Sequence, residues 1–258
     1  MGRFDGATVL ITGATGGLGR GAAKAFAIEG ARLVLSDLDE AALTDFAATL
    51  DAETTILAGN IADEKLSEDL VALAVEKFGR LDIAVNNAGI VHSFVRLPQV
   101  ASDEARRVLE VDLLGVFYAM KHQIPQMERQ FRASGKGGAI VNIASVAGLS
   151  GAPKLSVYAA AKHGVVGLTR SAAVEYATKG VRINAVCPAH TRTAMVDGFV
   201  RSSGSPEAEA IAELTRGVPM KRVGEVDEIT TGILFLADPA NSFMTGHTLA
   251  VDGGIGAI

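Results

Sequence analysis

A tyrosine and a lysine four positions apart, Tyr158 and Lys162, are well suited to proton-transfer chemistry. In a helix these positions lie on one face, so the ammonium comes within reach of the phenolic oxygen. Tyrosine has an unperturbed pKa of about 10, and a neighbouring cation favours its phenolate. The pair would suit a general acid/base, and an ordinary core tyrosine with an ordinary surface lysine is the alternative when the two are seen alone. Ser145, which ends an apolar run, is predicted to hydrogen-bond the substrate oxygen.

A glycine-rich segment, Thr12 to Gly19, follows the first apolar run and leads directly into a helical pattern. Glycines at such a turn let the backbone approach a pyrophosphate, which the helix N-terminus stabilises. A turn that only packs a helix on a sheet is the alternative. The missing Gly-Lys-Ser/Thr ending disfavours a nucleoside triphosphate. The predicted contacts are Gly13, Thr15, Gly16, Gly17, Leu18 and Gly19.

An acidic residue, Asp37, ends the second apolar run, 20 positions after Gly17. A carboxylate there accepts hydrogen bonds from an adenosine ribose, and it repels a 2′-phosphate. Neither Gly16 nor the neighbouring Leu38 supplies a compensating positive charge. The sequence therefore predicts NAD in preference to NADP, unless Asp37 only caps the helix that follows.

Short β-branched runs alternate with longer helical patterns along the chain, and this alternation predicts a parallel sheet with helices on both faces. We expect one α/β domain over residues 1–258, a doubly wound sheet of about seven strands. A lid is expected at about 190–217, with an irregular stretch at Ser202 to Pro206. Predicted strands are Thr8–Thr12, Arg32–Ser36, Thr54–Ala58, Ile83–Asn86, Ala139–Ile143, Arg182–Cys187 and Thr248–Val251. Predicted helices are Gly19–Glu29, Glu40–Leu50, Leu66–Phe78, Asp103–Phe131, Val157–Tyr176 and Val226–Leu236.

The composition excludes several classes of function. The chain has 29 acidic and 24 basic residues and no basic patch, which disfavours nucleic acid as a partner. Its one cysteine, Cys187, fits a reducing compartment, and its five histidines show no metal-ligand spacing. We find neither a signal peptide nor an apolar run long enough to span a membrane, so a cytoplasmic protein without a metal is expected.

The chain resembles the short-chain dehydrogenase/reductase family over essentially its whole length. Four segments carry the resemblance besides the glycine turn: Asn86-Asn87-Ala88-Gly89, Ser145, the Tyr158 to Lys162 segment, and Val251-Asp252-Gly253-Gly254. The resemblance implies a Rossmann-type fold and reversible hydride transfer between a nicotinamide dinucleotide and an alcohol/carbonyl pair. It also implies proton relay through Lys162 and the nicotinamide ribose, and a homo-oligomer, typically a tetramer.

Further coenzyme contacts follow from the same resemblance. Tyr158 and Lys162 are expected to contact the coenzyme as well as the substrate. Thr191 and Thr193 are expected at the nicotinamide carboxamide. The remaining contacts implied are Leu38, Asn60, Ile61, Asn87, Ala88, Gly89 and Pro188.

The chain departs from the family at Asp112, where the usual residue is an asparagine that forms a fourth catalytic member. An ionised Asp112 favours a protonated Lys162 and a neutral Tyr158. We therefore expect the relay to persist, with the pH optimum for oxidation on the alkaline side.

The substrate walls implied by the resemblance are largely apolar, which favours a small cyclic or aliphatic secondary alcohol or its ketone. Two other classes of function stay open from sequence: an NAD-binding regulator without activity, and an isomerase or dehydratase that retains its coenzyme. The expected pocket residues are Val91, His92, Val146, Leu149, Leu155 and His190.

Overall fold

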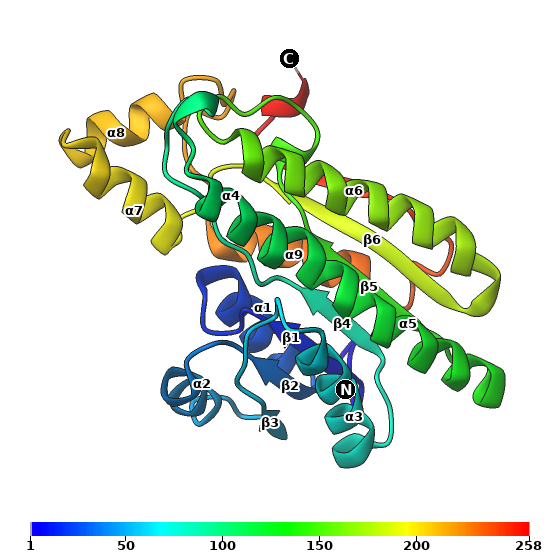
Figure 1. Cartoon of the computed structure of the whole chain (residues 1–258). Coiled ribbons are helices and arrows are strands. Elements are labelled where there is room, and N and C mark those ends of the chain that lie inside the picture. The colour runs from blue at the N-terminus through cyan, green and yellow to red at the C-terminus, as the bar shows by residue number, and fades with distance from the viewer. Residues whose placement is uncertain (1, 258) are drawn as a thin grey trace.

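A seven-stranded parallel sheet forms the centre of the molecule, in the order β3-β2-β1-β4-β5-β6-β7 (Figure 1). The computed structural model describes residues 2–257, except the side chains of residues 202 and 203. The predicted doubly wound sheet is confirmed. The strands are β1 Thr8–Thr12, β2 Arg32–Ser36, β3 Thr54–Ile56, β4 Ile83–Asn86, β5 Gly138–Ile143, β6 Val181–Pro188 and β7 Thr248–Val251.

Helices cover both faces of the sheet. One buried apolar cluster joins the sheet to α1, α2 and α9, and a second joins the opposite face to α3, α5 and α6. Strands buried on both faces explain why β1 and β4 read as continuous apolar runs. The helices are α1 Gly17–Ile28, α2 Glu40–Ala47, α3 Glu64–Phe78, α4 Ser102–Leu109, α5 Gly115–Ser134, α6 Ser156–Tyr176, α7 Ala194–Ser203, α8 Glu207–Leu214 and α9 Val226–Ala237.

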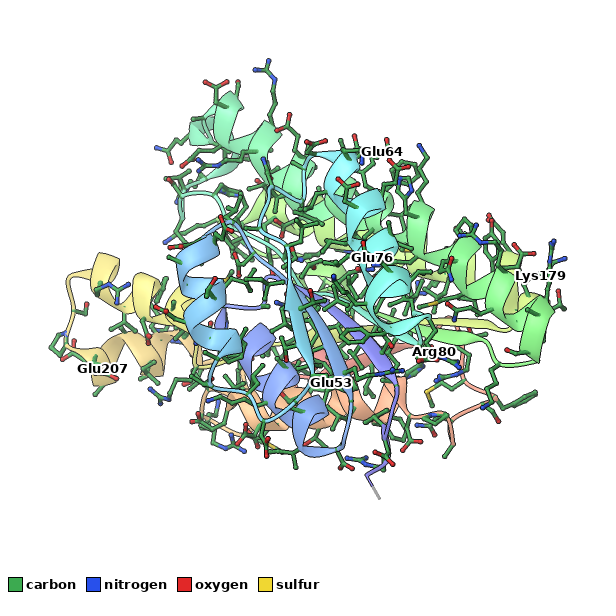
Figure 2. The ribbon with its side chains drawn as sticks, turned by 90° about the horizontal axis from the view of Figure 1, so that it is seen from below. Glu53, Glu64, Glu76, Arg80, Lys179 and Glu207 are labelled. Atoms are coloured by element: carbon green, nitrogen blue, oxygen red, sulfur yellow. The ribbon has the colours of Figure 1, made fainter. Side chains whose placement is uncertain are left out.

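Charged side chains of both signs occupy the outside of the molecule. Figure 2 shows Glu76, Lys179 and Glu207 on the exterior of three different helical segments, and all three are exposed. The mixture agrees with the small net charge of −5.

The helix predicted over Asp103–Phe131 is wrong in one respect, because a π-helical turn at Glu110–Leu114 separates α4 from α5. The backbone N–H of Gly115 bonds to the carbonyl of Glu110, five residues back. Such a turn is less regular than an α-helix and is frequent at functional sites. Asp112 lies in it and is completely buried.

The segment expected as a lid, 190–217, is partly helical in the structure, and the irregular stretch predicted at Ser202 to Pro206 contains the non-helical residues 204–206 between two helices. Residues 190–217 contain α7 and α8, joined at Gly204, which has a φ of +68°. Glycine adopts this left-handed conformation without the steric cost that a Cβ brings. The ring of Phe199 on α7 packs against Phe94, with centroids 5.1 Å apart. This contact joins α7 to the loop after β4.

Candidate active site

The carboxyl ends of β1 and β4 meet where the strand order reverses, the usual place for a ligand in an open α/β sheet. Asn87 joins the two loops there. Its side-chain N–H groups donate to the carbonyls of Thr12 and Gly13, at 3.0 and 2.9 Å. The backbone N–H groups of Asn87 and Ala88 donate to the Thr12 hydroxyl at 3.1 and 3.2 Å. The second loop is therefore fixed against the glycine turn.

The glycine turn packs tightly on itself and on the loop after β4 because its glycines lack side chains. A Cβ on Gly19 would lie 2.1 Å from the carbonyl oxygen of Gly13, and Gly13 itself has a φ of +64°. Gly16 precedes α1 without a side-chain cap, so the first N–H groups of the helix stay open to an anion. Open N–H groups at the start of a helix are the feature that the pyrophosphate of a dinucleotide requires, so the turn fits such a group.

The Asp37 carboxylate is held in place beside the same turn. Its Oδ2 accepts from the Thr15 backbone N–H at 2.8 Å and the Thr15 hydroxyl at 2.6 Å, and its Oδ1 accepts from the Leu38 N–H at 2.7 Å. The cap of α2 is Asp39, which accepts from the Ala42 N–H at 3.0 Å. Asp37 is therefore not the cap of α2, and the alternative raised from sequence falls.

A second cluster lies at the same edge of the sheet, around α6. The Lys162 Nζ is 5.5 Å from the centre of the Tyr158 ring, donates to the Ile143 carbonyl at 3.0 Å and lies 3.2 Å from Asp112 Oδ2. Asp112 Oδ1 accepts from the Ile90 N–H at 2.8 Å. The Lys162 side chain is 4% exposed and that of Asp112 is fully buried. The structure thus brings three of the four predicted catalytic side chains together.

Burial and charge act on the three groups in different ways. Burial raises the pKa of Tyr158; Lys162 opposes that effect and Asp112 adds to it. Burial also raises the pKa of Asp112, against the Lys162 charge and the Ile90 N–H. For Lys162, burial lowers the pKa, but the attraction of Asp112 and Tyr158 outweighs it, so the ammonium stays charged. The geometry favours a protonated tyrosine beside a charged lysine.

Ser145 completes the cluster from the end of β5. Its hydroxyl accepts from the Ala147 N–H at 3.1 Å and begins the short 3₁₀ turn Val146–Gly148. A hydrogen bond from Ser145 favours the phenolate of Tyr158 and lowers its pKa, which opposes the effect of burial. The serine therefore faces the tyrosine hydroxyl.

The other expected coenzyme residues occupy different surroundings. Thr193 lies over the glycine turn, since a Cβ on Gly17 would be 2.7 Å from its methyl group. Thr191 is buried and donates to the Ala189 carbonyl at 3.0 Å, and Pro188 ends β6. Asn60 is exposed and uses its side-chain oxygen locally, on the Ala62 N–H at 3.1 Å.

Ile61 and Leu38 differ sharply in exposure. Ile61 is buried against Gly115, whereas Leu38 is 69% exposed beside Asp37. The exposed Leu38 side chain offers an apolar surface on which a flat ring of a ligand can pack.

The expected pocket residues divide into two groups. Val91, Val146 and Leu155 are half-buried and Leu149 is 40% exposed. His92 is buried; its Nδ1 lies 2.7 Å from the Ser93 carbonyl and its Nε2 has no hydrogen-bond partner.

His190 lies elsewhere. It lines a cavity of about 310 Å³ with Arg222, Glu228 and Asp252, and none of the other five expected pocket residues lines this cavity. Burial lowers the pKa of His190.

Sequence reasoning missed Arg20. Its Nε donates to the Thr15 carbonyl at 2.8 Å, and its guanidinium lies 4.5 Å from the centre of the Phe46 ring. The position of Arg20, directly after Gly19, was a usable signal. The sequence gives no signal for the Ile90 N–H and the Ile143 carbonyl as partners in the site, since nearly every residue carries these backbone groups.

Two kinds of feature are absent from the described residues. They include no group of three or more histidine, cysteine or acidic side chains that could hold a metal ion. Within residues 2–257, no helix combines the length and apolar character needed to cross a bilayer.

Comparison with known proteins identifies the family of the chain. Residues 13–256 match a family model described as enoyl-(acyl carrier protein) reductase. Cyclohexanol dehydrogenase from Acinetobacter sp. strain SE19 is 38% identical, over 97% of this chain and 95% of that protein. The chain belongs to the short-chain dehydrogenase/reductase family of oxidoreductases.

Solved structures of other proteins resemble this chain in both sequence and fold. The structure of levodione reductase is 36% identical with a TM-score of 0.92, over 98% of this chain and 99% of that chain. ElxO, solved with NADP bound, is 32% identical with a TM-score of 0.89, over the same shares of the two chains. The family therefore includes nicotinamide coenzyme binders of this architecture.

Proposed function

We propose that the protein is an NAD-dependent oxidoreductase that transfers hydride reversibly between a nicotinamide coenzyme and a secondary alcohol or its ketone. The observation that carries this proposal is the buried cluster of Tyr158, Lys162 and Asp112, with Ser145 facing the tyrosine. It lies at the same sheet edge as the open glycine turn. Cyclohexanol dehydrogenase and levodione reductase, by their names, act on small cyclic alcohol or ketone compounds, which supports the choice of substrate class.

The chain's residues divide the work between positioning and proton transfer. Ser145 holds the substrate oxygen, and the Tyr158 hydroxyl gives a proton to that oxygen in reduction or removes one in oxidation. Lys162 stabilises the phenolate, and its ammonium is fixed by Ile143 and Asp112. The coenzyme, when bound, supplies or accepts the hydride. Its pyrophosphate is proposed to lie on the turn from Gly13 to Gly19, and the carboxamide beside Thr191 and Thr193.

The preference for NAD is proposed from the Asp37 carboxylate. Three N–H or O–H donors already fix this carboxylate, so it stays in place to accept from a ribose hydroxyl. A 2′-phosphate brought there meets a like charge, which opposes its binding. Asn87, Ala88 and Gly89 form the neighbouring wall, with Leu38, Asn60 and Ile61 on the adenine side.

The test is a spectrophotometric screen at about 340 nm, the absorbance of reduced nicotinamide. NAD and NADP are each combined with secondary alcohols, sugars, hydroxysteroids and acyl thioesters. We expect reduced coenzyme with NAD and small cyclic or aliphatic secondary alcohols. Coenzyme binding without turnover on the whole panel would instead indicate a regulator, and product formation without net coenzyme change would indicate an isomerase or dehydratase.

We also propose that the protein is a cytoplasmic homotetramer. Several large apolar side chains are exposed on the helical surfaces around α5 and α6, which supports burial between copies of the chain. Light scattering after gel filtration tests the assembly, and a monomeric mass would contradict it. The exposed side chains are Leu109, Leu114, Phe117 and Val174.

A further inference from the structure

The cavity of about 310 Å³ that His190 lines has no part in the proposed reaction. Four segments far apart in the sequence form its walls: residues 189–190 after β6, the loop 218–224, the start of α9, and residues 250–254 at the end of β7. The four side chains of the catalytic cluster are described, and none of them lines it. Because Met220 on its wall is 65% exposed, the cavity opens to solvent.

Backbone hydrogen bonds hold the walls of this cavity together. The Gly224 N–H donates to the His190 carbonyl at 2.9 Å, and the Met220 N–H donates to the Gly253 carbonyl at 3.2 Å. Lys221, in the same loop, has a φ of +55°, a left-handed conformation that is uncommon for a residue with a Cβ. The cavity is therefore formed before any ligand binds, which reduces the ordering cost of binding.

Two of the charged side chains on the walls satisfy each other. The terminal nitrogens of Arg222 donate to the two carboxylate oxygens of Glu228, at 2.7 and 2.6 Å. Glu228 also accepts from the Glu225 N–H at 2.8 Å. The two charges cancel, so this pair closes one wall and attracts neither a cation nor an anion.

Asp252 and His190 keep hydrogen-bonding capacity. The Asp252 oxygens accept from the Gly254 and Gly256 N–H groups, at 2.9 and 2.8 Å, and each oxygen can accept a second bond. No ion pair within 4 Å includes Asp252 among the described residues. The His190 imidazole has no hydrogen-bond partner in the part of the chain that the structure describes. Burial lowers the pKa of His190, so the ring is neutral at pH 7.

The rest of the lining is largely apolar. Val218 and Ile229 on its walls are 2% and 1% exposed. A carboxylate without a counter-charge, a neutral imidazole and an apolar wall suit a ligand with a cationic N–H donor and an apolar body. An anion would meet the like charge of Asp252. The volume lies at the lower end of the range of about 300–1,000 Å³ for ligand pockets, so the ligand is small.

We propose that this cavity is a binding site for a small organic ammonium ion. The ammonium donates to Asp252 and His190, and the apolar body of the ligand packs on Val218 and Ile229. The ligand is bound unchanged, at a site separate from those of the coenzyme and the alcohol or ketone. The inference therefore goes beyond the proposed function and does not depend on it.

The test is calorimetric titration of the full-length protein with benzylammonium. Benzamide and benzoate are the comparison probes, of similar shape but neutral and negatively charged. The same titrations are made on Asp252→Asn, which removes the charge and keeps an oxygen acceptor, and on His190→Phe, which removes the imidazole acceptor and keeps a ring. Asp227→Asn is the matched control, because Asp227 is an exposed carboxylate in the first turn of α9 that does not line the cavity.

We expect benzylammonium to bind the natural protein with a Kd of about 1 mM or lower, and benzamide and benzoate to bind at least about tenfold more weakly. Asp252→Asn should weaken the binding of benzylammonium by about tenfold or more, and His190→Phe by about fivefold. Asp227→Asn should stay within about twofold of the natural protein. His190→Phe leaves the turn at 252–256 intact, so it decides the question if Asp252→Asn disturbs that turn.

Three results would overturn the inference: no binding of benzylammonium, equal affinity for benzamide or benzoate, or unchanged affinity in His190→Phe. A repeat of the titration in saturating NAD tests that the site is separate, and displacement of benzylammonium by NAD would also overturn it. An absence of turnover with alcohols and ketones contradicts the proposed function alone, because the titrations need no reaction.

Discussion

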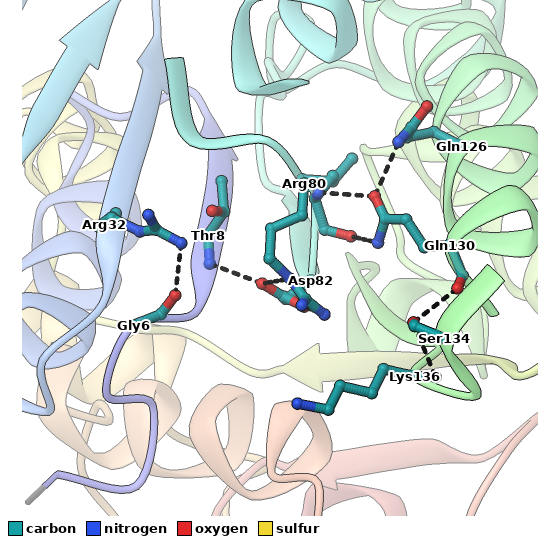
Figure 3. A network of polar contacts seen from close by, with 10 residues as sticks. Gly6, Thr8, Arg32, Arg80, Asp82, Gln126, Gln130, Ser134 and Lys136 are labelled. Carbon is teal, nitrogen blue, oxygen red and sulfur yellow. Dashed lines mark hydrogen bonds and ion pairs between the residues drawn. The ribbon is translucent and has the colours of Figure 1, made fainter. Parts of the chain in front are cut away.

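Two aspartate–cation pairs occupy opposite edges of the central sheet and differ mainly in burial. Asp82 and Arg80 lie at the amino edge, where the Asp82 carboxylate also accepts from the Thr8 N–H at 2.9 Å (Figure 3). Asp112 and Lys162 lie at the carboxyl edge. The side chains of Asp82 and Arg80 are 15% and 31% exposed, whereas those of Asp112 and Lys162 are 0% and 4% exposed.

The difference fits a structural role for the Asp82–Arg80 pair and the chemical role that we propose for the Asp112–Lys162 pair. At the amino edge, water and several protein donors share the charges, and the pair joins the starts of β1 and β4. At the carboxyl edge, little screening separates Asp112 and Lys162 from Tyr158, so each charge acts strongly on the phenol. An aspartate paired with a cation is therefore expected to stabilise the fold at the amino edge and to change the pKa of a tyrosine at the carboxyl edge.

The largest effect is expected for Tyr158→Phe, which removes the proton-transferring hydroxyl. Turnover should fall by about 10³-fold or more, since no other side chain in the cluster is placed to replace it. Thermal stability and NAD affinity should stay close to those of the natural protein. Steady-state kinetics and a coenzyme titration check this, and substantial residual activity would mean that the acid/base is another group.

Breaking the buried pair should be costly to folding. Lys162→Met leaves Asp112 buried without its counter-charge, and we expect a loss of about 3 kcal/mol in the free energy of unfolding. Urea unfolding followed by circular dichroism measures it. Asp112→Asn in the same background should recover part of the loss; if it recovers none, the cost does not come from the unpaired carboxylate.

The smallest effect is expected at the amino edge. Asp82→Asn weakens the charge-assisted hydrogen bonds to Thr8 and Arg80 and should cost about 1 kcal/mol of stability. The kcat and its pH dependence should be unchanged, because this edge is distant from Tyr158 along the strands. A changed pH profile in Asp82→Asn would remove the distinction between the two edges.

Much of the fold followed from the sequence because its strands are buried on both faces. The bounds of β1, β2, β4 and β7 were predicted correctly. The π-helical turn at Glu110–Leu114 was missed, since its local pattern reads as a continuous helix and only the tertiary partners of Asp112 distinguish it. The helices α7 and α8 were missed because they are short and lie beside turn-forming residues.

The candidate site was predictable where side chains carry its chemistry. Tyr158 and Lys162 were identified from residue type and spacing and Asp112 from the family resemblance, and the structure brings the three together. The support that Lys162 receives from the Ile143 carbonyl comes from the backbone, which no residue type reveals. Arg20 contacts the Thr15 carbonyl and the Phe46 ring. The sequence does not reveal these contacts, because the second depends on how α2 lies beside α1.

We propose that the Asp112 charge helps to hold the proton on Tyr158, and the pH dependence of alcohol oxidation in Asp112→Asn tests this claim. Oxidation requires the phenolate, so raising the pKa of Tyr158 moves the rise of kcat/KM to higher pH. The natural protein and Asp82→Asn should share one alkaline profile. In Asp112→Asn, the rise should move to lower pH by on the order of one unit. Identical profiles for the natural protein and Asp112→Asn would contradict the claim.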